Sequence, residues 1–212
     1  MVGSIYSHVF ALGYDSFLAW GERAGMQTLR RDVLAGATGW VLEIGAGTGL
    51  NATLFPADVE RITFSEPDPA MRHRLRQRVA SIGRRHEILD APADHLPVDS
   101  GVVDTVVSTL VLCTVADLAA TLAEIRRVMA PGGRLILIEH VRAPGPCLRG
   151  WQDRLHKPWM AFAEGCHCNR DIVAALRVAG FSTAQLQMAR WKRMPPIVSP
   201  LVFGSAAPQR LG

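Results

Sequence analysis

Residues 41–51, Val-Leu-Glu-Ile-Gly-Ala-Gly-Thr-Gly-Leu-Asn, constrain the fold of this chain more than any other stretch. Val41, Leu42 and Ile44 are apolar, as in a strand that is covered on both faces. Three glycines at alternate positions follow, and such a turn lets backbone approach a ligand where any Cβ would collide. From about Leu50 we expect a short helix, to residue 55, whose free N–H groups point at that ligand. The alternative is an ordinary strand, turn and helix in which the glycines allow tight packing.

A glutamate, Glu43, precedes the first of these glycines by two positions. The spacing G-x-G-x-G differs from the G-x-G-x-x-G of turns that hold a dinucleotide pyrophosphate. A carboxylate here would repel a pyrophosphate but suits a cationic ligand, such as the ammonium and sulfonium of S-adenosyl-L-methionine. The pattern E-x-G-x-G-x-G resembles the first motif of the class I S-adenosylmethionine-dependent methyltransferases. A nicotinamide-dependent reductase is a less favoured alternative.

Strands and helices alternate along the chain, which predicts a parallel sheet with right-handed crossovers. We predict one Rossmann-like α/β domain with a doubly wound, mostly parallel seven-stranded sheet, an antiparallel last strand, and helices on both faces. The predicted strands after the first are residues 61–65, 87–89, 102–108, 134–139, 182–188 and 201–206; the predicted helices are 4–35, 50–55, 69–82, 117–129 and one that Asn169 caps.

The 212 residues are expected to form one methyltransferase domain in three parts. Residues 1–36 would be a helical lid, 37–140 the cofactor-binding half, and 141–212 the acceptor-side segment with the final strands. The N-terminal helix is apolar on most of its circumference, so something should cover it. A plain packing helix and shallow contact with a membrane surface are the alternatives to a lid.

Composition excludes several classes of function. The net charge is only +4, and no Lys/Arg block is interleaved with aromatic residues, so we expect no nucleic-acid partner. The start lacks a secretory leader, which favours a cytoplasmic protein with reduced thiols. The stretch Cys166-His167-Cys168 has no paired C-x-x-C, so we expect no metal site.

An acidic residue at the end of the second strand can accept hydrogen bonds from both ribose hydroxyls of a nucleoside. Glu66 follows Gly49 by 17 residues, close to the spacing expected for that role. Asp68 is the competing residue, and it is expected to begin the next helix instead. The arginines of that helix, at positions 72, 74, 76 and 78, are expected to form a solvated face.

The order of motifs over residues 35–206 resembles the class I methyltransferases throughout. Three segments, Ser108–Cys113, Glu139–Val141 and Gly165–His167 with Arg170, resemble the animal microsomal thiol methyltransferases (the methyltransferase-like type 7 group) and their bacterial relatives. The resemblance implies methyl transfer from S-adenosyl-L-methionine, with S-adenosyl-L-homocysteine as product, to a small lipophilic acceptor, preferably a thiol. The animal proteins carry an N-terminal hydrophobic anchor, and the start of this sequence does not resemble one.

The same resemblance implies which residues form the site. One departure is Pro92, which stands where the wider superfamily usually has an aspartate, so the resemblance does not imply a carboxylate bond to the adenine amine. The implied cofactor-binding residues are Glu43, Gly45, Ala46, Gly47, Gly49 and Asn51 for the glycine turn and methionine portion, Glu66 and Pro67 for ribose and adenine, Ala93 and Asp94 for the adenine edge, Thr109 and Leu110 near the reacting centre, and Tyr14 over the cofactor.

Methyl transfer is an in-line displacement in which alignment alone can contribute about 7–11 kcal/mol. A thiol has a pKa of about 8.5, so no strong acid–base pair is required. His140, directly after the fifth strand, is the first candidate base, with a histidine bonded into the core edge as the alternative. His167, between two cysteines, is the second candidate, whereas Cys113 is interpreted as a small buried residue.

The sequence leaves two interpretations of the residues that would surround the methyl acceptor. Trp151, Trp159 and Phe162 could wall an apolar acceptor pocket or simply pack under the lid. The partner is therefore expected to be a small-molecule acceptor, with peripheral membrane contact as an option. N-methylation of an amine or a phospholipid headgroup is the enzymatic alternative, and a non-catalytic S-adenosylmethionine-binding protein is the alternative of another class.

Overall fold

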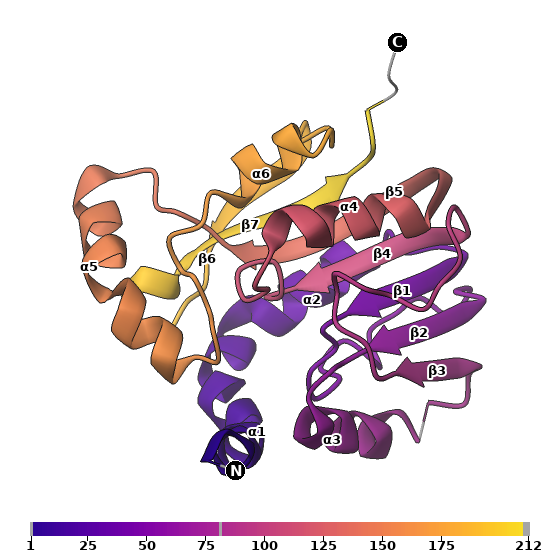
Figure 1. The fold of residues 1–212 in the computed structure, drawn as a ribbon, viewed down its shortest axis with the longest axis horizontal. Coiled ribbons are helices and arrows are strands. Elements are labelled where there is room, and N and C mark those ends of the chain that lie inside the picture. Colours follow the sequence, from indigo (N-terminus) through magenta and orange to yellow (C-terminus); the bar gives the residue numbers. More distant parts are fainter. Residues whose placement is uncertain (1, 81, 210–212) are drawn as a thin grey trace.

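The computed structural model describes residues 2–80 and 82–209, with side chains from residue 11 onward, and seven strands of this part form one sheet (Figure 1). Neighbouring strands are parallel except where β7 pairs with β5 and with β6. The predicted mostly parallel sheet with an antiparallel last strand is confirmed. In spatial order the strands are β3 His86–Leu89, β2 Arg61–Ser65, β1 Trp40–Ile44, β4 Val103–Thr109, β5 Met129–His140, β7 Pro200–Ala206 and β6 Gln185–Arg190.

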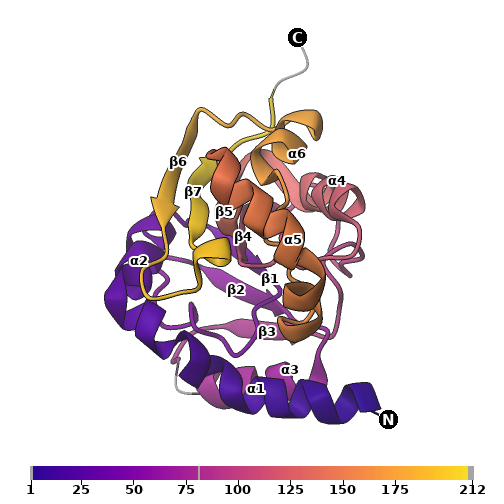
Figure 2. The same ribbon diagram turned by 90° about the vertical axis from the view of Figure 1, so that its left-hand side faces the viewer.

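Helices cover both faces of the sheet (Figure 1, Figure 2). Successive strand side chains point to opposite faces, so β1 sends Leu42 and Ile44 into one hydrophobic cluster, with α4 and α6, and Val41 into the other, with α2 and α3. The helices are α1 Val2–Gly21, the π-helical turn η1 Glu22–Met26, α2 Gln27–Leu34, α3 Pro69–Val79, α4 Leu118–Val128, α5 Pro146–Phe162, α6 Ile172–Val178 and the 3₁₀ turn η2 Pro196–Val198.

The centre of the sheet sets the position of the site. From β1 the chain moves outward to β2 and β3, and it then returns to β4 on the other side of β1. Ligands of such open sheets bind beyond the carboxyl ends of the strands, at the point where the strand order reverses. The glycine turn after β1 and the loop after β4 meet at this point, because Ile44 lies beside Ser108 in the sheet register.

The N-terminal helical stretch is kinked, and its first part lies beside α3 (Figure 2). Gly25 in η1 has φ 130°, which L side chains rarely adopt. Asp15 of α1 forms ion pairs with Arg74 at 3.0 Å and with Arg78 at 2.8 Å. The prediction of a solvated arginine face is therefore wrong for Arg74 and Arg78. It is also wrong for Arg72, which is buried and bonds Asp90 and the Glu66 carbonyl.

Two predicted helical features are wrong. Residues 50–55 form turns with i→i+3 bonds, such as Ala52 N to Gly49 O at 3.0 Å, in place of a helix. Pro56 removes the next backbone donor, so the segment is too short for α-helical bonding. Helix α6 is capped by Asp171, which accepts from the Ala174 amide, and not by Asn169.

Helix α5 falls in a stretch for which no helix was predicted. Pro146 occupies its first turn, where a missing N–H costs no hydrogen bond, and Pro158 lies inside it. In the part of the chain that the structure describes, no helix combines the length and the apolar character needed to cross a membrane.

Candidate active site

A cavity of about 440 Å³ lies at the carboxyl ends of the strands, bordered by α1, α5 and the loops after β1, β2, β3 and β4. Gly45 and Gly47 of the glycine turn, and most of the predicted candidates in the later loops, come together around it. The predicted site residues that line the cavity are Tyr14, Gly45, Gly47, Glu66, Pro67, Ala93, Asp94, Leu110 and His140.

The three glycines of the turn differ in what surrounds them. All have positive φ, from 53° to 82°, a region that favours glycine. A Cβ on Gly45 would lie 2.7 Å from a Val111 methyl, and one on Gly49 would lie 2.7 Å from Leu75 Cδ1. A Cβ on Gly47 would meet nothing closer than 4.0 Å. Gly45 and Gly49 therefore allow close packing, and the backbone of Gly47 faces space that a ligand can fill.

Glu43 lies behind the turn in a buried polar network, and it is not part of the cavity lining. Asn51 Nδ2 donates to Glu43 Oε1 at 2.8 Å and to Thr109 Oγ1 at 2.9 Å. Arg30 donates to Asn51 Oδ1 at 2.9 Å. Among the described residues, Glu43 Oε2 is buried without a hydrogen-bond partner. Burial raises the pKa of Glu43 to about 8, so a cation beside Oε2 would stabilise its charged form.

Glu66 connects the glycine turn to the start of α3. Its Oε2 accepts from the Gly47 amide at 2.7 Å, and its Oε1 accepts from the Asp68 amide at 2.8 Å. Burial raises the pKa of this carboxyl, and the two backbone donors oppose that effect. Asp68 caps α3 by accepting from Ala70 and Met71. Both carboxylates line the cavity, but Asp68 begins α3, as expected, whereas both oxygens of Glu66 accept from backbone amides beside the cavity.

His140 lines the far side of the cavity, at the end of β5. Its ring stacks on Trp191 with the ring centroids 5.6 Å apart. Burial lowers its pKa to about 4, although a hydrogen bond with the Val198 backbone acts in the opposite direction. Within residues 2–80 and 82–209, its buried Nδ1 has no hydrogen-bond partner. His140 is thus an uncharged imidazole with an unused polar atom at neutral pH.

His167 does not line the cavity. Its Nδ1 lies 2.7 Å from His156 Nε2 of α5, and partial burial together with the charge of Arg170 lowers its pKa. The structure thus separates the two candidate bases: one borders the cavity, and the other joins α5 to the following segment. Ala46, Gly49, Asn51 and Thr109 also lie outside the lining.

The residue that shapes the loop after β4 was not among the predicted site residues. Glu139 is fully buried and accepts from Ser108 Oγ at 2.7 Å and from three consecutive backbone amides, the first at Val111, at 3.0–3.3 Å. This loop contains Leu110 at φ 62°, an uncommon conformation for a residue with a side chain. A lone glutamate at the end of a strand carries no signal for such a role.

The acceptor end of the cavity is aromatic. Phe17 of α1 and Phe162 of α5 contact edge to face at 5.9 Å, and Trp159 lies 5.7 Å from Phe162. These three residues line the cavity, whereas Trp151 is exposed on α5. Cys113 and Cys166 also line it.

Comparison with known proteins agrees with this geometry. The family model for a methyltransferase domain matches residues 42–137. Thiol S-methyltransferase TMT1B of Homo sapiens is 35% identical over 82% of this chain and 73% of its own length. Thiol S-methyltransferase TMT1A of Homo sapiens is 32% identical over 93% of this chain and 82% of its own length. The solved structure of a SAM-dependent methyltransferase from Thermotoga maritima has the same fold, with a TM-score of 0.68, 20% identity and 95% coverage of both chains.

Proposed function

Because this chain belongs to the S-adenosylmethionine-dependent methyltransferases, in the family of the thiol S-methyltransferases TMT1A and TMT1B, we propose that it methylates small lipophilic thiols. The observation that carries the proposal is the cavity itself. Its inner end carries the glycine turn and Glu66, and its other end is aromatic. A cofactor and an apolar acceptor can therefore meet in one cavity, as in-line displacement requires.

The residues at the inner end fit S-adenosylmethionine. We assign the unpartnered Glu43 Oε2 to the cationic methionine portion, the backbone of Gly47 to close approach, and Glu66 to the ribose hydroxyls. Pro67, Ala93 and Asp94, which follow β2 and β3, border the space for adenine. When bound, the cofactor supplies an electrophilic methyl on its sulfonium, and S-adenosylhomocysteine is the product.

At the acceptor end, Phe17, Trp159 and Phe162 supply apolar surface and exclude water. We propose that His140 accepts a hydrogen bond from the acceptor thiol through its unused Nδ1. With a pKa near 4 it is too weak a base to hold the proton of a thiol at neutral pH. His140 would therefore orient the sulfur, and the proton would leave to water.

Shallow contact with a membrane surface would suit a lipophilic acceptor. Leu12 and Trp20 of α1 are about 70% exposed, and Trp151 and Phe162 of α5 are half exposed. We propose that these side chains reach the interface of a lipid bilayer. Co-sedimentation with phosphatidylcholine vesicles, with Trp20→Ser and Trp151→Ser as variants, tests this: binding lost in the double variant supports it, and no binding by the wild type overturns it.

The deciding experiment is calorimetric titration with S-adenosylmethionine, followed by mass spectrometry of methylated products from a panel of thiols and amines. Gly47→Arg should abolish binding, because its side chain would fill the cavity. Gly101→Arg is the matched control: its φ of 73° imposes the same backbone strain, its Cβ has free space, and it lies before β4, at the opposite end of the sheet. Methylated amines without methylated thiols would favour N-methylation, and binding without any product would favour a non-catalytic protein.

A further inference from the structure

Two free cysteines meet in the wall of the cavity. Cys113 Sγ and Cys166 Sγ lie 3.8 Å apart, although 53 residues separate them in the chain. Both are buried, with 1% and 6% exposure, and both line the cavity. The other cysteines differ: Cys147 is exposed on α5, and Cys168 is buried in a separate cluster with Ile197 and Val198. Only the first two, among the described residues, form a close thiol pair that a small molecule in the cavity can reach.

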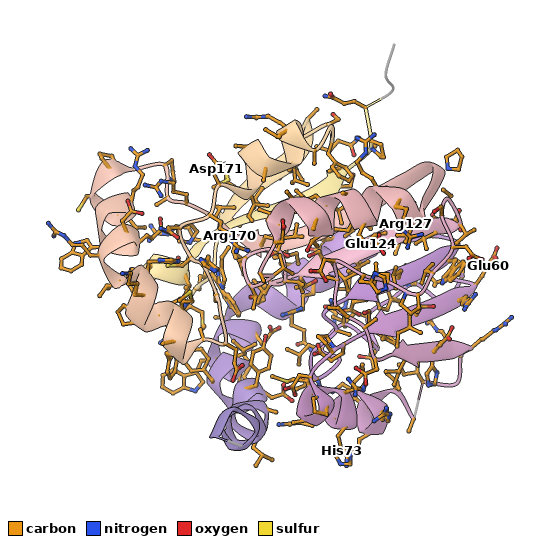
Figure 3. All side chains as sticks on the ribbon, viewed as in Figure 1. Glu60, His73, Glu124, Arg127, Arg170 and Asp171 are labelled. Atoms are coloured by element: carbon orange, nitrogen blue, oxygen red, sulfur yellow. The ribbon has the colours of Figure 1, made fainter. Side chains whose placement is uncertain are left out.

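The backbone around the pair is already joined. The amide of His167 donates to the Cys113 carbonyl at 2.7 Å, and Arg170 donates to the Leu112 carbonyl at 2.8 Å. Figure 3 labels Arg170, which lies in the segment between α5 and α6. A disulfide has an S–S length of about 2.0 Å, so the sulfurs need to approach by less than 2 Å. Side-chain rotation with a small loop adjustment can supply this movement.

The two thiols are unequal in acidity. The hydrogen-bonded contact with Cys113 and the positive charge of Arg170 lower the pKa of Cys166. Pairing with Cys166 and burial raise the pKa of Cys113 well above its usual range. A more acidic thiol beside a less acidic one is the arrangement of a redox-active pair, in which the first sulfur reacts as its thiolate and the second resolves the product.

We propose that Cys113 and Cys166 form an oxidative modification site, where a hydroperoxide joins the two sulfurs as a disulfide that blocks the acceptor end of the cavity. The Cys166 thiolate attacks one peroxide oxygen, the O–O bond breaks, and hydroxide leaves to become water, which gives a sulfenic acid. The Cys113 thiol then attacks the Cys166 sulfur, and the hydroxyl leaves with the thiol proton as a second water. Each sulfur loses one electron, and the peroxide gains two.

The disulfide affects methyl transfer through the loop after β4. Cys113 follows Leu110 and Val111, which line the cavity, and its amide is bonded to Glu139. Pulling Cys113 toward Cys166 displaces this wall, and a misplacement of about 1 Å near a reacting centre can lower the rate about a hundredfold. Thiols reverse the modification by exchange, two acceptor thiols giving one acceptor disulfide and two cysteines. This part rests on the proposed thiol substrate, so acceptor thiols would themselves restore the enzyme.

The test exposes the full chain to hydrogen peroxide, removes the peroxide with catalase, and maps disulfides by mass spectrometry of unreduced peptides. We expect a peptide that joins Cys113 to Cys166, a methylation progress curve that starts about tenfold or more below the untreated rate, and a lag that shortens as acceptor thiol is raised. Cys147→Ser should behave like the wild type, because this exposed thiol lies outside the cavity. Cys113→Ser and Cys166→Ser, each compared with its own untreated rate, should show no cross-link and no lag.

Three results would overturn the proposal: no joined peptide in the wild type, a joined peptide with an unchanged initial rate, or a lag of the same size in Cys113→Ser. These results differ from a failure of the proposed function, in which the untreated protein would methylate no thiol. In that case the joined peptide still decides the modification site. A rise in unfolding temperature on oxidation should accompany it, because the bond closes a long loop.

Discussion

Glu66 Oε2 accepts the amide hydrogen of Gly47 at 2.7 Å, so the acidic residue that ends β2 fixes the glycine turn that follows β1. The other oxygen, Oε1, accepts from the Asp68 amide. Both oxygens therefore face backbone donors and still offer lone pairs to the cavity. One carboxylate thus shapes the turn and, in the proposed function, presents acceptors to the ribose of the cofactor.

The first prediction concerns this carboxylate. In Glu66→Gln, the new NH₂ group must face either the Gly47 or the Asp68 amide, and two donors repel. We expect S-adenosylmethionine binding to weaken about 10- to 100-fold and stability to fall by about 1–3 kcal/mol, as for a charged hydrogen bond. Calorimetry and denaturant unfolding measure the two effects. Glu60→Gln is the control, since Glu60 is exposed on the side of the molecule opposite α5 (Figure 3); equal loss in both variants would contradict the prediction.

The second prediction concerns Glu43 and pH. The folded protein without ligand keeps a proton on Glu43 up to about pH 8, whereas the unfolded chain releases it near pH 4.5. The folded state thus binds more protons between these values, and stability falls as the pH rises through this window. Glu43→Gln carries no such proton, so its unfolding temperature should match the wild type near about pH 5 and exceed it near about pH 8.

Cofactor binding should show the opposite trend for the same residue. The ammonium of S-adenosylmethionine favours ionised Glu43, so wild-type affinity should rise with pH up to about 8. Glu43→Gln should bind at least about tenfold more weakly at pH 8, although it is the more stable protein. Calorimetry in buffers of different ionisation enthalpy measures the released proton. A variant that is less stable and binds equally well would contradict this assignment.

The third prediction concerns the docking of α1. Asp15 forms ion pairs with Arg74 and Arg78, which are partly exposed, and it accepts a hydrogen bond from the buried Thr48 hydroxyl. Asp15→Asn should therefore cost less than about 1 kcal/mol of global stability. Amide hydrogens of residues 11–20 should exchange faster, and S-adenosylmethionine affinity should fall several-fold, because Tyr14, Phe17 and Leu18 of α1 line the cavity. Asp32→Asn, at an exposed acidic residue on α2, should change neither the exchange rate nor the affinity.

Local pattern made much of this fold predictable. Apolar runs predicted β2 at its observed bounds, and Asp68 was correctly expected to begin α3, because both depend on the geometry of neighbouring elements. Helix α5 was not predicted, because Pro146 and Pro158 are of a residue type that usually ends a helix. A proline is nevertheless tolerated in the first turn, where Pro146 lies. Residues 50–55 show the opposite error. A helix was predicted there, but so short a segment before Pro56 does not form α-helical hydrogen bonds.

The parts of the site that could not be predicted depend on long-range contacts. Arg78 and Asp15 are 63 residues apart in the chain, and Cys113 and Cys166 are 53 residues apart. The periodicity of apolar residues along the sequence therefore predicts neither pair. The same holds for Glu139, whose partners become visible only when the loop after β4 folds over it. His140 and His167 looked equivalent as candidate bases, and only the packing of α5 places the second outside the cavity.

The last prediction concerns the charge of the acceptor. Glu66, Asp68, Asp94 and Glu164 line the cavity, whereas no lysine or arginine of the described residues does. At about 10 Å and an effective dielectric of about 20, each carboxylate repels an anion by about 1–2 kcal/mol before screening. A neutral alkyl thiol should therefore have a kcat/KM at least about tenfold above that of a carboxylate-bearing thiol of equal length.

The variant Glu164→Gln, at the exposed rim, should lower this ratio of kcat/KM values by raising activity toward the anionic thiol alone. Added salt should lower the ratio as well. Steady-state rates for the matched thiols decide the matter, since faster turnover of the anionic thiol would show that its charge is neutralised by a group outside this lining.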